Sequence, residues 1–110
     1  MTDDELIGGL ADGTLPPGGF DHRAHLRLTW LCLRRYGRSD TEQRLLAGLR
    51  ALAARAGKPD KFNAALTLAW IARVDAASAA LPRAHSFDEL LLRYPELLDR
   101  RTVREVAQTI

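Results

Sequence analysis

Helix-start signals recur along this chain, and they constrain its fold more than any other feature. Three segments place Ser or Thr three residues before Glu, beginning at Thr2, Ser39 and Ser86. In such a capping box the hydroxyl accepts a hydrogen bond from the third helical N–H, and the carboxylate reaches back to the first residue. Gly37 and Gly57 directly follow periodic segments, where a residue that tolerates positive φ closes a helix. Strand-like alternation is nearly absent, so the sequence predicts an all-α fold.

The spacing of apolar residues predicts where the helices lie. We expect them over about residues 3–11, 21–36, 40–56, 60–81, 87–93 and 100–108. The segment 62–81 is apolar nearly all round, which is typical of a helix enclosed by others. A chain of 110 residues forms one domain with a single core. The prediction is therefore a compact orthogonal or bundle-like domain, residues 1–110, with five to six helices around a central apolar helix at about 60–81.

Composition excludes several classes of protein. The 16 basic and 14 acidic residues are spread along the whole chain, so there is no nucleic-acid footprint. The longest apolar stretch contains Arg73 and Asp75, which a membrane span rarely tolerates. The chain has one cysteine, Cys32, in an apolar setting typical of a buried thiol. Its N-terminus is acidic and lacks a signal-peptide pattern, and both features favour a cytoplasmic protein. The alanine-rich second half of the 60–81 helix allows close approach of another helix, so we expect a homodimer.

Two histidines one helical turn apart are the most informative candidates for chemistry. His22 and His25 share a face with Leu26 and Thr29 on the predicted 21–36 helix. Imidazole is costly to bury without a partner, so the pair points inward or into a cleft. An arginine stripe, which includes Arg27, lies on another face of the same helix.

Three interpretations of the histidine pair stay open. A metal site would need further ligands, and only His85 and Cys32 are at hand. A structural role would place His22 at the helix N-terminus and bond His25 to a backbone carbonyl. In the third interpretation His22 and His25 are catalytic, one imidazole moves a proton, and neighbouring arginines hold an anionic group. We adopt the third as the leading hypothesis, with no metal and no cofactor.

The long apolar helix offers partners for such a site. Asn63, Thr67 and Trp70 fall at i, i+4 and i+7 on one face, where amide, hydroxyl and indole could orient and wall a substrate. The alternative for Thr67 is a bond to its own i−4 carbonyl, and for Arg73 a structural ion pair. The residues predicted to bind the substrate are Phe20, Arg27, Trp30, Asn63, Thr67, Trp70 and Arg73. No phosphate-binding glycine loop and no nucleophile elbow occurs.

Three blocks of the sequence resemble a family of small, uncharacterised bacterial helical proteins. These blocks are FDHRAHLRLTW at 20–30, KPDKFNAALT at 58–67 and YPELLD at 94–99. The family reads F-x-H-x-x-H-h-R-h-x-W, then K-Y-H-x-T-h-T, then P-x-L-L-D, where h is apolar. The resemblance implies a shared cleft lined by histidines. Asn63 stands where the family has a histidine, which weakens the case for a multi-histidine metal centre and leaves an altered cleft.

In size and in its Ala, Leu and Arg content the chain also resembles accessory enzymes of bacterial natural-product clusters. Among these are the proteins that close a lysinoalanine bridge in cinnamycin-type lantibiotics. That resemblance implies addition of a lysine amine to a dehydroalanine in a bound peptide, which requires a base, a groove and a cation. The functional hypothesis is thus a cofactor-independent tailoring enzyme acting on a small molecule or peptide. The alternatives are a non-catalytic helical binding or regulatory module and a histidine-ligated metal protein.

Overall fold

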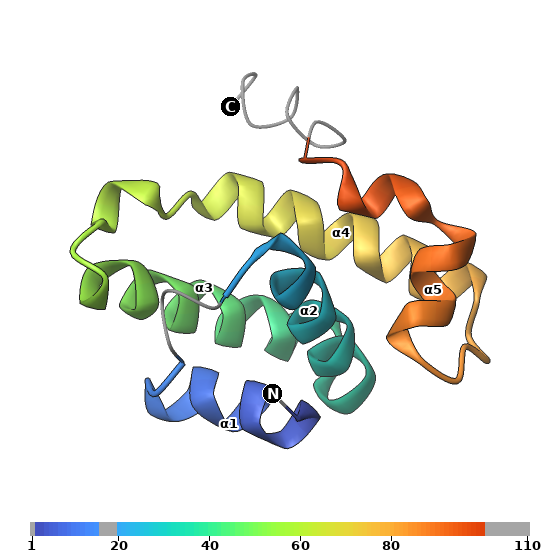
Figure 1. The fold of residues 1–110 in the computed structure, drawn as a ribbon, viewed down its shortest axis with the longest axis horizontal. Helices are drawn as coiled ribbons and strands as arrows, with labels where there is room; N and C mark the ends of the chain where they lie inside the picture. The colour runs from blue at the N-terminus through green and yellow to red at the C-terminus, as the bar shows by residue number, and fades with distance from the viewer. Residues whose placement is uncertain (1, 16–19, 101–110) are drawn as a thin grey trace.

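The computed structural model describes residues 2–15 and 20–100, and within these ranges every regular element is a helix (Figure 1). The all-α prediction is therefore confirmed for the described part of the chain. Its elements are α1 (Asp3–Asp12), α2 (His22–Tyr36), α3 (Arg38–Arg55), the 3₁₀ turn η2 (Pro59–Lys61), α4 (Ala64–Ala80), α5 (Phe87–Arg93) and the 3₁₀ turn η3 (Pro95–Leu98). The helix expected over 100–108 lies, apart from Arg100, outside the described residues.

The helix-start signals hold at both ends of the domain. At α1 the Glu5 N–H donates to the Thr2 hydroxyl at 3.1 Å and the Thr2 N–H donates to the Glu5 carboxylate, so this capping box is complete. At α5 the Ser86 hydroxyl caps the Glu89 N–H as expected. The Glu89 carboxylate accepts from the N–H of His85, one residue before the cap, instead of from the N–H of Ser86 itself. The second capping box is therefore incomplete.

The third predicted capping box, at Ser39, is wrong. Gly37 ends α2 and begins α3, with a φ of 82° that suits glycine, and no side chain caps α3. The chain therefore changes direction at a single residue, and Ser39 already lies inside the helix. Two long helices are joined by a sharp corner where the sequence predicted a short linker.

The long apolar helix starts later than predicted. Phe62 and Asn63 are extended, and the Asn63 side chain accepts a hydrogen bond from the N–H of Leu66 at 2.9 Å. Asn63 is thus the cap of α4, not a mid-helix residue. The turn at 56–63 lets α3 and α4 run back alongside one another (Figure 1).

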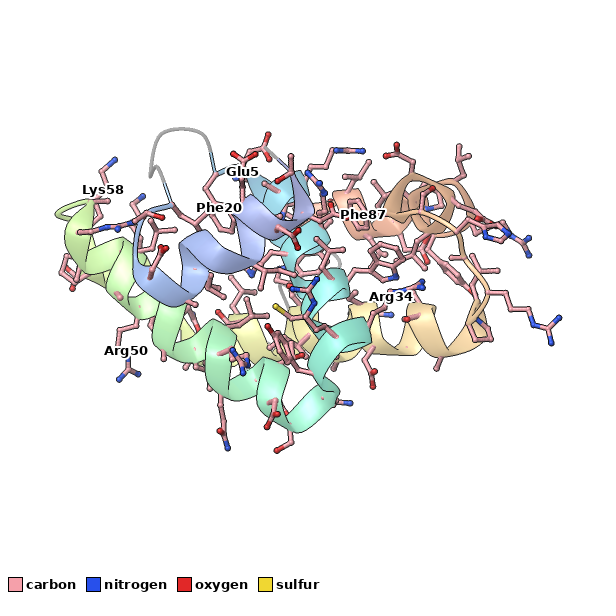
Figure 2. All side chains as sticks on the ribbon, turned by 90° about the horizontal axis from the view of Figure 1, so that it is seen from below. Glu5, Phe20, Arg34, Arg50, Lys58 and Phe87 are labelled. Atoms are coloured by element: carbon pink, nitrogen blue, oxygen red, sulfur yellow. The ribbon has the colours of Figure 1, made fainter. Side chains whose placement is uncertain are left out.

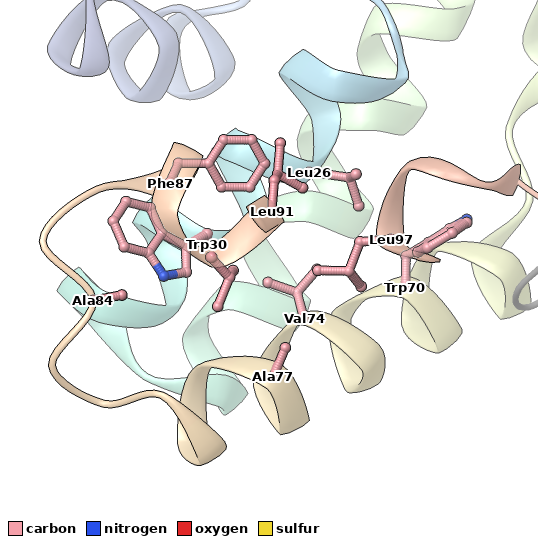
Figure 3. Packing of buried hydrophobic residues seen from close by; sticks show 10 residues of the cluster. Leu26, Trp30, Trp70, Val74, Ala77, Ala84, Phe87, Leu91 and Leu97 are labelled. Atoms are coloured by element: carbon pink, nitrogen blue, oxygen red, sulfur yellow. The ribbon is translucent and has the colours of Figure 1, made fainter. Parts of the chain in front are cut away.

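Two helices share the centre of the fold. Both α2 and α4 contribute to each of the two core clusters, one toward α5 and η3 (Figure 3) and one toward α1 and α3. Residues Leu26 and Trp30 of α2 and Trp70 and Val74 of α4 belong to the first cluster. On its other side α4 is open to solvent at Arg73, Ala76, Ala79 and Ala80. The expectation that other helices enclose α4 all round is therefore wrong for that side.

Among the described residues, no helix is both long and apolar enough to cross a membrane. The homodimer and the cytoplasmic location stay predictions.

Candidate functional site

The histidine motif begins with a well-formed helix start. Asp21 caps α2 by accepting from the Ala24 N–H at 2.8 Å. Phe20, just before the cap, lies against His25, with ring centroids 5.9 Å apart. This pairing across the first turn is the geometry of a hydrophobic staple, with an imidazole as one member. Asp21 and Phe20 therefore help to form the start of α2, and the contact between Phe20 and His25 holds both rings in place.

A cavity of about 660 Å³ opens between the N-terminal ends of α2 and α4 and the C-terminal half of α3, and we call it the histidine pocket. Its size suits a small organic molecule or part of a peptide. Six of the nine residues predicted for the site line it. The described residues that line it are Phe20, Asp21, His22, His25, Leu49, Leu52, Ala53, Ala56, Lys58, Lys61, Phe62, Asn63, Leu66, Thr67, Trp70 and Arg100.

His22 is held in place by two contacts. Its Nε2 lies 2.9 Å from the backbone oxygen of Leu97 in η3. Because a carbonyl oxygen only accepts, this Nε2 carries the proton of the hydrogen bond. The ring also meets Trp70 edge to face, with centroids 4.7 Å apart. His22 thus joins the start of α2 to the last described turn of the chain.

His25 is the less satisfied of the two rings. Its Nε2 is buried and has no hydrogen-bond partner among the described residues. Burial, aided by the nearby His22, lowers the pKa of His25 from 6.5 to about 4, so the ring is neutral near pH 7. The structural alternative bonded His25 to a backbone carbonyl. Among the described residues the His25 ring makes no such bond, and the ring that contacts a backbone carbonyl is that of His22.

The polar residues of α4 have structural partners of their own. The oxygen of the exposed Asn63 amide is committed to its cap. The buried Thr67 hydroxyl donates to the Asn63 backbone oxygen at 2.9 Å, which is the i−4 bond considered as its alternative. Both residues still form part of the pocket wall. Their hydrogen bonds are local, so the polar atom of the wall without a partner among the described residues is the Nε2 of His25.

Three predicted site residues lie elsewhere. Arg73 is exposed on the outer side of α4, because the helix presents that position away from α2. Arg27 and Trp30 lie along a second surface hollow, which also includes Arg23 and Arg34 and which we call the arginine face. In Figure 2 Phe20 and Lys58, from the histidine pocket, lie on one side of the centre, and Arg34 and Phe87, from the arginine face, lie on the other.

On the arginine face each described arginine has a partner. Arg23 pairs with Asp88, and Arg27 pairs with Asp3. Arg34 donates to the Ala84 backbone oxygen at 2.9 Å and stacks over the Trp30 ring, 4.7 Å from its centroid. These contacts tie α2 to α1 and to the start of α5, so the stripe helps to hold the fold together.

The basic residues of the histidine pocket were not among the predicted site residues. Lys58 precedes the η2 turn, Lys61 is its last residue, and Arg100 follows η3. All three are exposed, and none has an ion-pair partner among residues 2–15 and 20–100. The proline turn after Lys58 was the only local signal available.

No group of three His, Cys, Asp or Glu side chains that could hold a metal ion occurs within the described ranges. Cys32 lies in the core, where burial raises the pKa of its thiol, as expected of a small packed hydrophobe. The metal interpretation therefore finds no ligand set among these residues.

Comparison with protein-family models, with curated proteins and with solved structures gives no match. The resemblance to a bacterial helical family therefore stays a prediction.

Proposed function

We propose that the histidine pocket is the active site of a small cofactor-independent enzyme that transfers a proton on a bound small molecule or peptide. The observation that carries this proposal is that His25, a residue of the pocket wall, has a buried Nε2 with no hydrogen-bond partner among the described residues. An orphaned polar atom costs stability, and a bound ligand that meets it would remove that cost. Its position beside a second imidazole gives the pocket two groups suited to acid–base chemistry.

The proton transfer follows from the state of the ring. In the tautomer with its proton on Nδ1, His25 offers the Nε2 lone pair to a substrate C–H or N–H. The proton moves to Nε2, the bonding electrons stay on the substrate, and the imidazolium returns the proton to a neighbouring atom. A pKa near 4 makes His25 a modest base that is free near neutral pH and a ready proton donor once charged.

The pocket also differs from the expected arrangement of cations. Arg27 and Arg73 were expected to stabilise an anionic intermediate, but neither lines the pocket. Lys58, Lys61 and Arg100 do, and they would take that role. Tailoring of a natural product, including lysinoalanine closure, belongs to this reaction class and stays a prediction.

The test uses nitrobenzisoxazole, a flat aromatic probe that opens when a base removes its ring proton. The N–O bond then breaks, giving a coloured phenolate and a nitrile. We expect the wild-type protein to accelerate this reaction and His25→Ala to lose most of the acceleration, about tenfold or more. His22→Ala should reduce the acceleration less, because in this mechanism His22 positions the pocket wall and His25 takes the proton.

The matched control is His85→Ala, which removes the third histidine, an exposed one outside the pocket. Circular dichroism checks that each variant is folded. Equal rates for the wild type and His25→Ala would contradict proton transfer by His25.

A non-catalytic binding module is the second candidate, because a ligand could satisfy the Nε2 of His25 without any reaction. Saturable binding of nitrobenzisoxazole without ring opening would favour it.

A further inference from the structure

We infer that the histidine pocket binds an amphiphilic anion, a molecule with an apolar body and one anionic oxygen group. This inference rests on the function proposed above, because it names the class of ligand for the same pocket. It is carried by three features of the lining: cations with no ion-pair partner among residues 2–15 and 20–100, two helix N-termini and an apolar interior.

The charges around the pocket are unbalanced. Among the described residues that line the pocket, Lys58, Lys61 and Arg100 are cations and Asp21 alone has a carboxylate, which already accepts from the Ala24 N–H. Asp60 lies between the two lysines in sequence but does not line the cavity. Unpaired exposed cations around a concave surface raise the local concentration of anions.

Helix dipoles add to this field. The N-termini of α2 and α4 both line the pocket, through Asp21, His22 and Asn63. Of the five α-helices described, these two alone have no acidic residue in the first turn. The cap of α4 is the neutral Asn63, so the positive end of that helix is not compensated.

The interior of the pocket is apolar. Trp70 and Phe62 contribute aromatic surface, and Leu49, Leu52 and Leu66 contribute aliphatic surface. A hydrated inorganic ion would leave this surface unused, whereas an aromatic or aliphatic body would cover it. The ring of His25, whose buried Nε2 has no hydrogen-bond partner among the described residues, lies in the same wall.

A matched pair of fluorescent probes separates charge from apolar fit. Anilinonaphthalene sulfonate carries an anionic group on the same aromatic skeleton that phenylnaphthylamine presents without charge. We expect the wild-type protein to bind the sulfonate more tightly. The double variant Lys58→Gln/Lys61→Gln should bind the sulfonate roughly fivefold more weakly and the neutral probe unchanged.

Three controls assign the effect to this pocket. Arg93→Gln removes an exposed cation of α5 that lines none of the described cavities, and it should change neither affinity. Ala53→Trp fills the histidine pocket and should block both probes, while Ala47→Trp fills a separate cavity between α1 and α3 and should block neither. Raising NaCl to about 1 M, where the Debye length is about 3 Å, should weaken only the binding of the sulfonate.

The inference is overturned if the lysine double variant binds the sulfonate as the wild type does, if both probes weaken equally, or if Ala53→Trp leaves both affinities intact. These binding outcomes are independent of the ring opening of nitrobenzisoxazole. Selective weakening with no ring opening would uphold the ligand class and reject proton transfer, and ring opening with unchanged probe binding would do the reverse.

Discussion

The histidine pocket and the arginine face contain similar kinds of residue, an aromatic wall and several cations, but they differ in how their polar groups are paired. On the arginine face Arg23, Arg27 and Arg34 all contact acidic or carbonyl oxygens. At the histidine pocket the lysines have no ion-pair partner in the described chain, and the Nε2 of His25 has no hydrogen bond. The paired groups of the arginine face stabilise the fold, whereas the unpaired groups of the histidine pocket line a cavity where a ligand could meet them.

This contrast predicts opposite effects of substitution in the two regions. The largest effect is expected at Trp30, which is 6% exposed and packs against Phe87. Trp30→Ala should lower the free energy of unfolding by about 3–5 kcal/mol, because it removes a large buried ring and the surface on which Arg34 stacks. Urea denaturation measures this loss. A loss below about 1 kcal/mol would show that the arginine face is not a structural region.

At His25 stability should instead depend on pH. The unfolded chain binds a proton at a pKa of 6.5 and the folded chain only at about 4, so the unfolded state holds more protons between these values. Stability therefore falls as the pH drops from 6.5 to 4, by about 3 kcal/mol in total, and is unaffected by this group above 6.5.

His25→Leu should remove that slope and should cost little or nothing near neutral pH, because it replaces an unpartnered buried polar group. Urea denaturation at a series of pH values tests both points, with His85→Leu as the exposed control. A slope that survives in His25→Leu would contradict the assignment.

A smaller effect is expected for the ion pair between Arg23 and Asp88, whose side chains are 50% and 74% exposed. A double-mutant cycle with Arg23→Met and Asp88→Asn should give a coupling energy of about 0–1 kcal/mol. The same variants should open nitrobenzisoxazole at the wild-type rate. A rate that falls with the loss of this pair would break the division between the two regions.

The smallest change in stability is expected for Asn63→Asp, within about 0.5 kcal/mol, because both residues cap helices well. The new carboxylate lies at the mouth of the histidine pocket, so sulfonate binding should weaken while the neutral probe binds as before. Fluorescence titration of the two probes, beside thermal unfolding, measures both. Unchanged sulfonate binding would argue against an effect of the α4 N-terminus on anions.

Local signals in the sequence were sufficient for most helix ends. The capping box at Thr2 and the glycine at position 37 each specify a backbone conformation that few alternatives satisfy. The start of α4 was misplaced because apolar periodicity continues through Phe62, although that residue is extended. The side chain of Asn63 decides this boundary, and its capping role depends on a turn that periodicity does not reveal.

The candidate site was predictable only where one helix carries it. Helical spacing correctly puts His22 and His25 on the same cavity. Helical spacing cannot say which neighbouring helix faces Trp30 or Arg73, because that depends on the angles at which the helices cross. Both residues lie outside the pocket. The basic residues came from a turn and from the far end of the described chain, where no periodic pattern exists to place them.

The hydrogen bond from His22 to Leu97 spans 75 positions of sequence, and its consequence concerns the order of assembly during translation. Helices α1 to α3 can emerge from the ribosome and pack while the acceptor for this imidazole has yet to be synthesised. The binding cavity is therefore completed only when the last described turn docks. A chain that ends before that turn would lose both the anchor of His22 and the buried side chain of Leu97.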